Sequence, residues 1–328
     1  MKKILALIVL AVTMVSCYEE YLLDYPYTAT YFYLQQDVRT FVVGEGMKFK
    51  VGVTMGGVSD NTIDRNVSFT LDNSLINPAL LDGMKIASQS FIKDAVANVS
   101  VLEPLPSSYY TLSNPSLMVI PKGWYTGEVL VKADSLAFTA DSLKTTRMAS
   151  YAIPFRITNC PEIDTILESK RTNVIGVMLE NKLFGNYWHG GQAVISGPTR
   201  NETVNYFTTI PTAENRIWNL TSAGPTTLIV NNFMDNTSFG GDTIMYLALK
   251  GTSVSLYSGP DAPFVITSDG ACTFNNSKLL QDRRIYLKYQ FTDADGNLYR
   301  CTDTLRFRNR IRDGINEWQD ENPANYTK

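Results

Sequence analysis

Histidine is almost absent from this chain: His189 is the only one among 328 residues. Zinc sites built from several imidazoles and histidine relays are therefore excluded. Most histidine-activated nucleophiles would have to use that single residue. Charged residues make up only 19% of the chain, and the formal net charge is −3. No surplus of basic residues attracts a phosphate backbone, so nucleic acid is not an expected partner. We expect no metal and no cofactor.

Cysteine is also scarce, with four residues and no CxxC pair. This spacing excludes a zinc ribbon and a thioredoxin-type site. Cys160, Cys272 and Cys301 allow at most one disulfide bridge among themselves, and Cys272 with Cys301 is the pair to test. The alternative is three buried thiols that pack as small apolar residues.

The chain lacks an apolar run long enough to cross a membrane as a helix. The apolar residues Ile4–Val15 follow Lys2 and Lys3 and would span only about 18 Å, against roughly 30 Å for the hydrocarbon layer. This arrangement is typical of a secretory signal peptide, which we place at residues 1–16. The signal peptide is removed from the mature protein.

The end of this segment resembles the lipobox of bacterial lipoproteins, in which a cysteine after a small residue is acylated. Cys17 follows Ser16 and would carry the lipid, with residues 17–27 as the acylated N-terminus and tether. The alternative is ordinary cleavage nearby, which leaves Cys17 as a free thiol or a bridge partner. Glu19 and Glu20 resemble the signal that directs lipoproteins of Bacteroidetes to the outer face of the outer membrane.

Short β-branched and aromatic runs separated by turn residues fill most of the remaining chain, so the predicted fold class is all-β. The expected strands include Val67–Leu71, Tyr151–Thr158, residues 172–179 and residues 284–292. Residues 28–160 are expected to form an Ig-like β-sandwich with Greek-key links. Residues 161–328 are expected to form a second antiparallel β-sandwich or a small β-barrel domain, with the boundary near Asn159-Cys160-Pro161. Residues 74–97 are predicted to contain a turn or two of helix or a long irregular crossover.

The glycine turn Asp295-Gly296 predicts a hairpin between two apolar-alternating runs near the C-terminus. The surrounding segment Asp293-Ala294-Asp295-Gly296-Asn297 resembles a calcium loop only superficially, because the distal glutamate is missing. Turn chemistry explains these residues better.

The densest candidate site is the segment Tyr187-Trp188-His189-Gly190-Gly191, which we expect to form a loop that could hold a sugar. A sugar ring stacks its C–H face on an aromatic ring, and its hydroxyls need planar polar groups. The candidate glycan-binding residues are Tyr187, Trp188, His189, Asn186, Gln192 and Trp218, with Asn205 nearby in sequence. The alternative is that Tyr187 or Trp188 packs in the core with His189 satisfied locally, and that Trp218 is simply buried.

Several motifs are similar to those of two-domain surface lipoproteins of Bacteroidetes that are encoded beside glycan-import systems, in the position of the starch-binding lipoproteins SusE and SusF. The motifs are Asp64-Arg65-Asn66-Val67-Ser68-Phe69, Tyr110-Thr111-Leu112, Val119-Ile120-Pro121-Lys122-Gly123, Tyr151-Ala152-Ile153-Pro154-Phe155-Arg156-Ile157, Gly185-Asn186-Tyr187-Trp188-His189-Gly190-Gly191 and Cys301-Thr302-Asp303-Thr304-Leu305-Arg306-Phe307. The resemblance implies a polysaccharide or oligosaccharide ligand, a lipid anchor in the outer membrane and a TonB-dependent importer complex as a partner.

Five Asp-Ser/Thr-apolar triplets resemble the O-glycosylation acceptor of exported Bacteroidetes proteins. The acceptor residues would be Ser135, Ser142, Thr165, Thr243 and Thr304. Roughly one or two such triplets are expected by chance at ordinary residue frequencies. We expect glycans first on Ser135 and Ser142.

Three functions are consistent with these patterns. The first is a non-catalytic glycan-binding lipoprotein that captures polysaccharide at the cell surface for an adjacent import system. The alternative is a structural or adaptor lipoprotein of the envelope that binds a protein partner through an apolar patch. A surface glycoside hydrolase is disfavoured, because it would need two carboxyl groups in a pocket and no local pattern identifies them.

Overall fold

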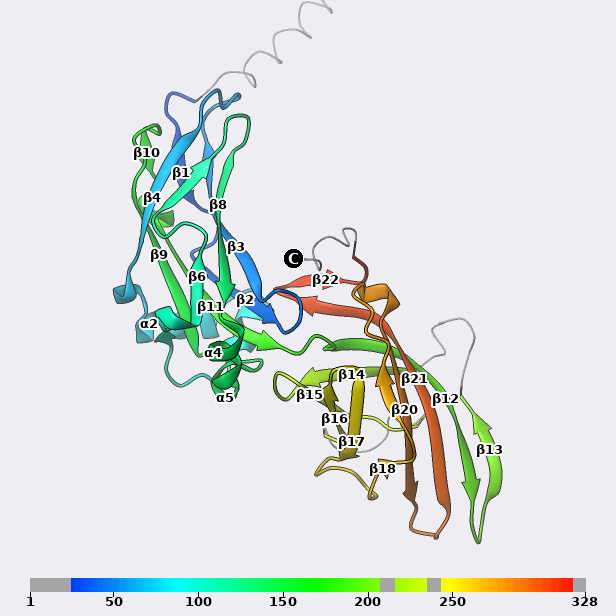
Figure 1. The fold of residues 1–328 in the computed structure, drawn as a ribbon. Coiled ribbons are helices and arrows are strands. Elements are labelled where there is room, and N and C mark those ends of the chain that lie inside the picture. The colour runs from blue at the N-terminus through cyan, green and yellow to red at the C-terminus, as the bar shows by residue number, and fades with distance from the viewer. Residues whose placement is uncertain (1–24, 207–215, 235–242, 321–328) are drawn as a thin grey trace, which may run out of the picture.

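The computed structural model describes residues 25–206, 216–234 and 243–320, and Figure 1 shows two β-rich domains joined along the chain. The expected signal peptide, the expected acylated Cys17 and tether residues 17–24 lie outside the described residues. Across the described segments, no helix combines the length and apolarity needed to span a bilayer.

The first domain is a sandwich of two sheets, which confirms the predicted fold class for this part of the chain. In order, the first sheet contains β10 (Thr165–Ile166), β1 (Ala29–Phe32), β3 (Lys48–Gly56), β8 (Thr126–Ala133) and β6 (Tyr110–Leu112). The second contains β2 (Gln36–Val42), β11 (Thr172–Glu180), β9 (Tyr151–Asn159), β4 (Arg65–Leu71) and β7 (Leu117–Ile120), and β5 (Glu103–Pro104) also pairs with β9.

Alternation of side chains along the strands builds the sandwich core. In β8, each of Gly127, Val129, Val131 and Ala133 is buried, while the residues between them face outward. Phe41 and Phe155 come from the second sheet and are completely buried against this layer. The core thus follows directly from period-two patterning on two facing sheets.

Helices cover the outer face of the second sheet. α2 (Pro78–Lys85) and α3 (Ser90–Val96) place Met84, Ile92 and Val96 in a second, smaller core. Asn77 caps α2, because its side chain accepts a hydrogen bond from the backbone N–H of Leu80, and Pro78 occupies the first helical turn. Residues 74–97 therefore contain two short helices, as in the first of the two predicted alternatives.

The remaining short helices lie on the sandwich domain and in the barrel domain. They are α4 (Ser135–Ala140), α5 (Ser142–Thr145), η1 (Asn73–Leu75), η2 (Ser107–Tyr109), η3 (Glu168–Lys170) and η4 (Leu280–Asp282). Asp134 caps α4 by accepting a hydrogen bond from the backbone N–H of Ala137.

The sandwich continues beyond the boundary expected after residue 160. β10 pairs in parallel with β1, and β11 pairs in parallel with β2 and antiparallel with β9. The chain therefore leaves the sandwich only after Glu180. The polar stretch at residue 161 is a connection inside the first domain, and long-range strand pairing of this kind leaves no local signal in a sequence.

The second domain is a closed barrel, the second of the two forms predicted for it. Within the described residues, eight strand positions follow one another around the ring. They are β12 (Gly185–Ser196), β14 (Arg216–Ser222), β15 (Thr227–Val230), β16 (Met245–Lys250), β17 (Ser253–Ser258), β18 (Thr267–Ser268) with β19 (Cys272–Phe274), β20 (Arg284–Thr292) and β21 (Leu298–Arg312). β12 and β21 run side by side and close the ring (Figure 1), while β13 (Asn201–Asn205) and β22 (Ile315–Glu317) extend its edges.

The predicted hairpin joins β20 to β21. Asp293 accepts hydrogen bonds from the backbone N–H groups of Asp295 and Asn297, and Gly296 has a φ of 81°. The carboxylate thus shapes a turn, as expected from turn chemistry.

The three cysteines Cys160, Cys272 and Cys301 are free and buried, so the bridge between Cys272 and Cys301 does not form. β19 and β21, which carry this pair, lie on opposite sides of β20. Two strand spacings separate their backbones by about 9.5 Å, too far for a disulfide.

The two domains meet at a buried ion-pair network around Glu45, which lies in the turn between β2 and β3. Arg283 and Arg310 of the barrel place guanidinium nitrogens 2.7 Å from its two carboxylate oxygens. Burial alone would raise the pKa of Glu45, but the charges and hydrogen bonds of the two arginines outweigh burial and lower it to about 2. Thr40 also donates a hydrogen bond to Asp313 across the junction.

Candidate functional site

The strand β12 divides the predicted glycan-binding residues between two environments. Tyr187 and His189 point into the barrel and are essentially inaccessible, whereas Asn186, Trp188 and Gln192 point outward. The segment was expected to be a loop that a ligand approaches, but it is the interior of a long strand paired on both sides. Successive side chains of a strand point to opposite sides, so residues that are neighbours in this sequence lie on opposite sides of the barrel wall.

Inside the barrel, Trp218 of β14 stacks on His189, with ring centroids 4.1 Å apart and an interplanar angle of 14°. Tyr206 stacks on the other side, at 5.3 Å from His189. Tyr187 packs edge-on against Phe307 and donates a hydrogen bond to the backbone carbonyl of Leu183. Tyr187, His189 and Trp218 are thus core residues, and none of them presents a ring to a surface ligand.

A buried carboxylate, Asp303 of β21, organises this interior cluster. Tyr206 and Tyr289 donate hydrogen bonds to its oxygens at 2.6 and 2.8 Å, and Nε2 of His189 lies 2.9 Å from it. Burial, and then the charge of Asp303, raise the pKa of both tyrosines, so they remain protonated donors. Hydrogen bonds from side chains of the barrel itself thus compensate the buried carboxylate.

The glycine at position 191 has a packing role. A Cβ there would lie 2.3 Å from Oδ1 of Asp303 and 2.5 Å from the backbone oxygen of Thr302. The residue is therefore small because β21 passes close to it, and not because a sugar approaches.

Outside the barrel, Trp188 is half-buried and lies beside Arg308 of β21, whose guanidinium carbon is 5.0 Å from the indole ring centroid. A β-bulge shifts the register between Asn186 and Tyr187, so that Arg308 and Asn309 follow one another on the outer surface before Arg310 turns inward. The bulge thus places a guanidinium and an amide together next to the ring.

Four asparagines form a ladder across the strands next to Trp188. Nδ2 of Asn219 donates to Oδ1 of Asn186 at 3.0 Å, and Nδ2 of Asn186 donates to Oδ1 of Asn309 at 3.3 Å. Nδ2 of Asn309 in turn donates to Oδ1 of Asn316 at 2.7 Å. We call the outward surface formed by Asn186, Trp188, Asn219, Arg308, Asn309 and Asn316 the Trp188 face.

The Trp188 face combines an aromatic ring with planar hydrogen-bonding groups on the outer surface of the barrel. Gln192 and Asn205 are directly opposite each other farther along β12, where both are exposed. Sequence reasoning found Asn186 and Trp188 but missed Arg308, Asn219, Asn309 and Asn316. The alternating pattern of β21 was visible in the sequence, but its register against β12 was not.

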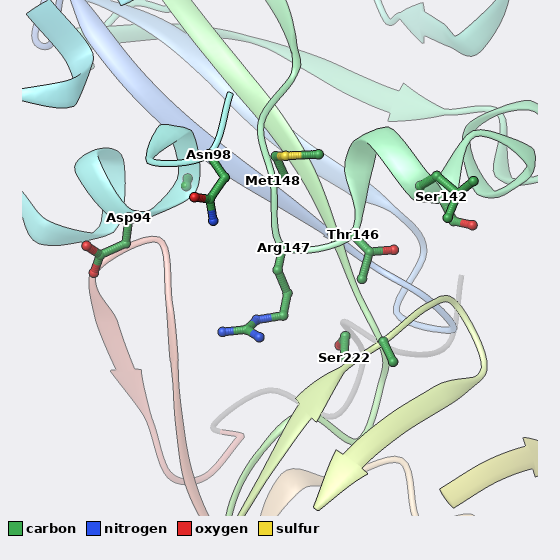
Figure 2. Close-up of a pocket in the computed structure, with 10 residues that line it drawn as sticks. Asp94, Asn98, Ser142, Thr146, Arg147, Met148 and Ser222 are labelled. Carbon is green, nitrogen blue, oxygen red and sulfur yellow. The ribbon is translucent and has the colours of Figure 1, made fainter. Parts of the chain in front are cut away.

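A cleft between the two domains is a second candidate site, with a volume of about 380 Å³. Asp94, Asn98, Ser142 and Thr146 line it from the sandwich side, and Ser222 lines it from the barrel side. Figure 2 shows Arg147 extending into the space between these two sides. The lining is polar and offers donors and acceptors to a small polar ligand.

Glu180 lies behind this cleft and accepts a hydrogen bond from Ser222. Burial raises the pKa of Glu180 to about 7, although the Ser222 hydrogen bond and the charges of Arg147 and Arg310 oppose the increase. Burial thus favours the protonated form of this carboxyl group. No cluster of three or more potential metal ligands occurs among the described residues.

The expected O-glycosylation acceptors lie in different settings. Ser135 is exposed at the start of α4, whereas Ser142 at the start of α5 is half-buried. Thr165, Thr243 and Thr304 are half-buried. The aspartate that precedes Thr304 is Asp303 of the barrel interior, so packing accounts for that triplet.

Comparisons with known proteins add information about the fold. A family model described as "-like, N-terminal domain" matches residues 23–162, which form most of the sandwich. A crystal structure of unknown function from Bacteroides ovatus is similar, with a TM-score of 0.63 and 19% identity over 91% of this chain and 99% of that one. A crystal structure of an auxiliary nutrient binding protein from Bacteroides thetaiotaomicron has a TM-score of 0.41 and 13% identity over 85% and 93% of the two chains.

No curated protein matches this chain. The similarity to the Bacteroides ovatus structure covers both domains and shows that this chain shares a two-domain β fold with a Bacteroides protein.

Proposed function

We propose that this chain is a non-catalytic glycan-binding lipoprotein, anchored through Cys17 in the outer membrane, that captures polysaccharide at the cell surface for an adjacent import complex. The apolar run before Cys17 and its resemblance to a lipobox support the anchor. Several acyl chains give lasting attachment, whereas one chain alone is marginal.

The observation that carries the binding function is the Trp188 face. An indole ring gives the apolar contact that a pyranose needs, and the asparagine ladder supplies donors and acceptors for its hydroxyls. The surface lies on the outside of the barrel, where a long polymer can lie across it. A few such contacts, offset by loss of mobility, lead us to expect micromolar to millimolar dissociation constants.

Affinity electrophoresis of the full mature chain in gels that contain single polysaccharides tests this function. We expect at least one glycan to retard the chain, and Trp188→Ala to abolish the retardation. The matched control is Trp124→Ala, because Trp124 is 65% exposed on the sandwich domain and lies in the loop before β8. Thermal melting should show that both variants remain folded.

Two results would contradict the proposal. Migration unchanged by a broad panel of plant, fungal and host glycans would favour the adaptor function instead. Equal retardation of Trp188→Ala and the parent chain would place the binding surface elsewhere, and the interdomain cleft would be the next region to test.

A further inference from the structure

Positive charge is concentrated on one side of the barrel, beside the Trp188 face. The outward residues of β20 and β21 include Arg284, Lys288, Arg300, Arg306 and Arg308. Within these two strands, which the structure describes in full, no outward side chain is acidic, because the single carboxylate, Asp303, points inward. The whole chain carries a formal charge of −3, so this segregation is not a consequence of composition.

Like charges face each other in this surface. Arg284 and Arg306 occupy directly opposed positions of the β20–β21 ladder, which brings two positive charges together on this surface. Burial, and then the charge of Arg306, lower the pKa of Arg284, and the charge of Asp282 opposes this decrease. Arg300 lies 3.7 Å from Asp269, while Lys288 and Arg308 form no ion pair with any described residue.

The cations are also spaced along the barrel. Outward side chains recur every two residues of a strand, so Arg300 and Arg306 lie about 20 Å apart. Arg308 is held beside Trp188 and donates from Nη1 to Oδ1 of Asn309 at 3.3 Å. A guanidinium held by stacking presents a planar fork that matches a carboxylate or a sulfate better than a neutral hydroxyl.

We propose that the outward face of β20 and β21 selects acidic polysaccharides, whose carboxylates or sulfates lie along its row of cations while a sugar ring contacts Trp188. This inference rests on the proposed glycan-binding function and specifies its ligand class. The ligand is a polymer because the cations extend well beyond the reach of one sugar unit.

The test compares polymers with matched backbones in affinity gels and in titrations of the full mature chain. Dextran and dextran sulfate differ only in sulfate, and polygalacturonate supplies carboxylates alone. We expect the chain to bind at least one of the two anionic polymers at least tenfold more tightly than dextran, with affinity that falls as salt rises. Binding to polygalacturonate identifies carboxylates as the recognised group, and binding to dextran sulfate alone identifies sulfates.

Variants then locate the contact. Lys288→Gln and Arg308→Gln should each weaken binding to the anionic polymer by about tenfold, since each removes one charge-assisted contact with an anion. Lys250→Gln is the control, because Lys250 is exposed at the end of β16, away from this face. It should bind as the parent chain does.

The outcomes separate this inference from the function on which it rests. Retardation by neutral glycans alone, lost in Trp188→Ala, would overturn the inference and leave the proposed function intact. Binding that weakens equally in Lys250→Gln and Arg308→Gln would also overturn it, because it would indicate non-specific attraction. Retardation by no polymer would overturn both.

Discussion

Replacing Glu45 by glutamine is expected to weaken the fold strongly at the junction between the two domains. The substitution keeps the shape of the side chain but removes the negative charge that faces Arg283 and Arg310. The side chains of these two arginines are 3% and 0% exposed. Arg283 then loses its ion pair, while Arg310 keeps Glu317 at 2.6 Å, in a site that water does not reach.

The magnitude follows from the pKa of Glu45, which falls from an ordinary value of 4.5 to about 2. At 1.36 kcal/mol per pKa unit, this decrease corresponds to about 3 kcal/mol of stability at neutral pH. Removal of one partner from a buried ion pair typically costs 3–5 kcal/mol, which agrees. We therefore expect Glu45→Gln to lower the free energy of unfolding by about 3 kcal/mol at pH 7.

The pH dependence has a definite sign. Because folding lowers the pKa of Glu45, its contribution is fully present above about pH 4.5 and is lost as the pH falls towards 2. The parent chain should lose stability over that range, and the difference between it and Glu45→Gln should shrink there.

Urea unfolding, followed by tryptophan fluorescence at several pH values, measures these effects. Urea is chosen as the denaturant because it adds no salt that would screen the charges. Glu128→Gln is the control, since Glu128 pairs with Lys50 at 2.6 Å but both side chains are exposed. An exposed pair of this kind contributes about 0–1 kcal/mol. A cost for Glu45→Gln no greater than that of the control would refute the reasoning.

Three further predictions concern other parts of the molecule. Folding raises the pKa of Glu180 to about 7, so the free energy of unfolding of the parent chain should fall by up to about 3 kcal/mol as the pH rises from 4.5 to 7. Glu180→Gln should therefore be the more stable chain in urea at pH 8. Equal stability at that pH would contradict the burial argument. In thermal melts, Gly191→Ala should lower the free energy of unfolding by about 3 kcal/mol or prevent folding. Gly224→Ala is the control and should have little effect, because a Cβ at residue 224 meets nothing within 4 Å. Mass spectrometry of the chain purified from its native envelope should show glycans on Ser135 and Ser142; an intact mass equal to that of the lipidated polypeptide would rule them out.

Local patterns predicted much of the architecture. Runs of β-branched and aromatic residues located β4, β9, β11 and β20 nearly residue by residue, and the Asp-Gly turn located the final hairpin. These features depend on neighbours in sequence, which is why they can be read without a structure. The short helices α4 and α5 were missed because each is less than two turns long.

The candidate site was predicted only in part. Asn186 and Trp188 do lie on an outer surface, but Tyr187, His189 and Trp218 fill the barrel, because successive residues of a strand point to opposite sides. Treating residues 187–191 as a loop concealed this alternation.

The amino-acid order alone determined that the chain is all-β, poor in histidine and without a zinc ribbon, and where most strands and turns lie. Only the tertiary structure decided where the sandwich ends, that the second domain closes into a ring, and which side chains from β12, β14, β21 and β22 gather around Trp188. These features depend on which strands pair and in which register. Pairing and register are set by packing between segments far apart in the chain, so no single stretch of sequence contains them.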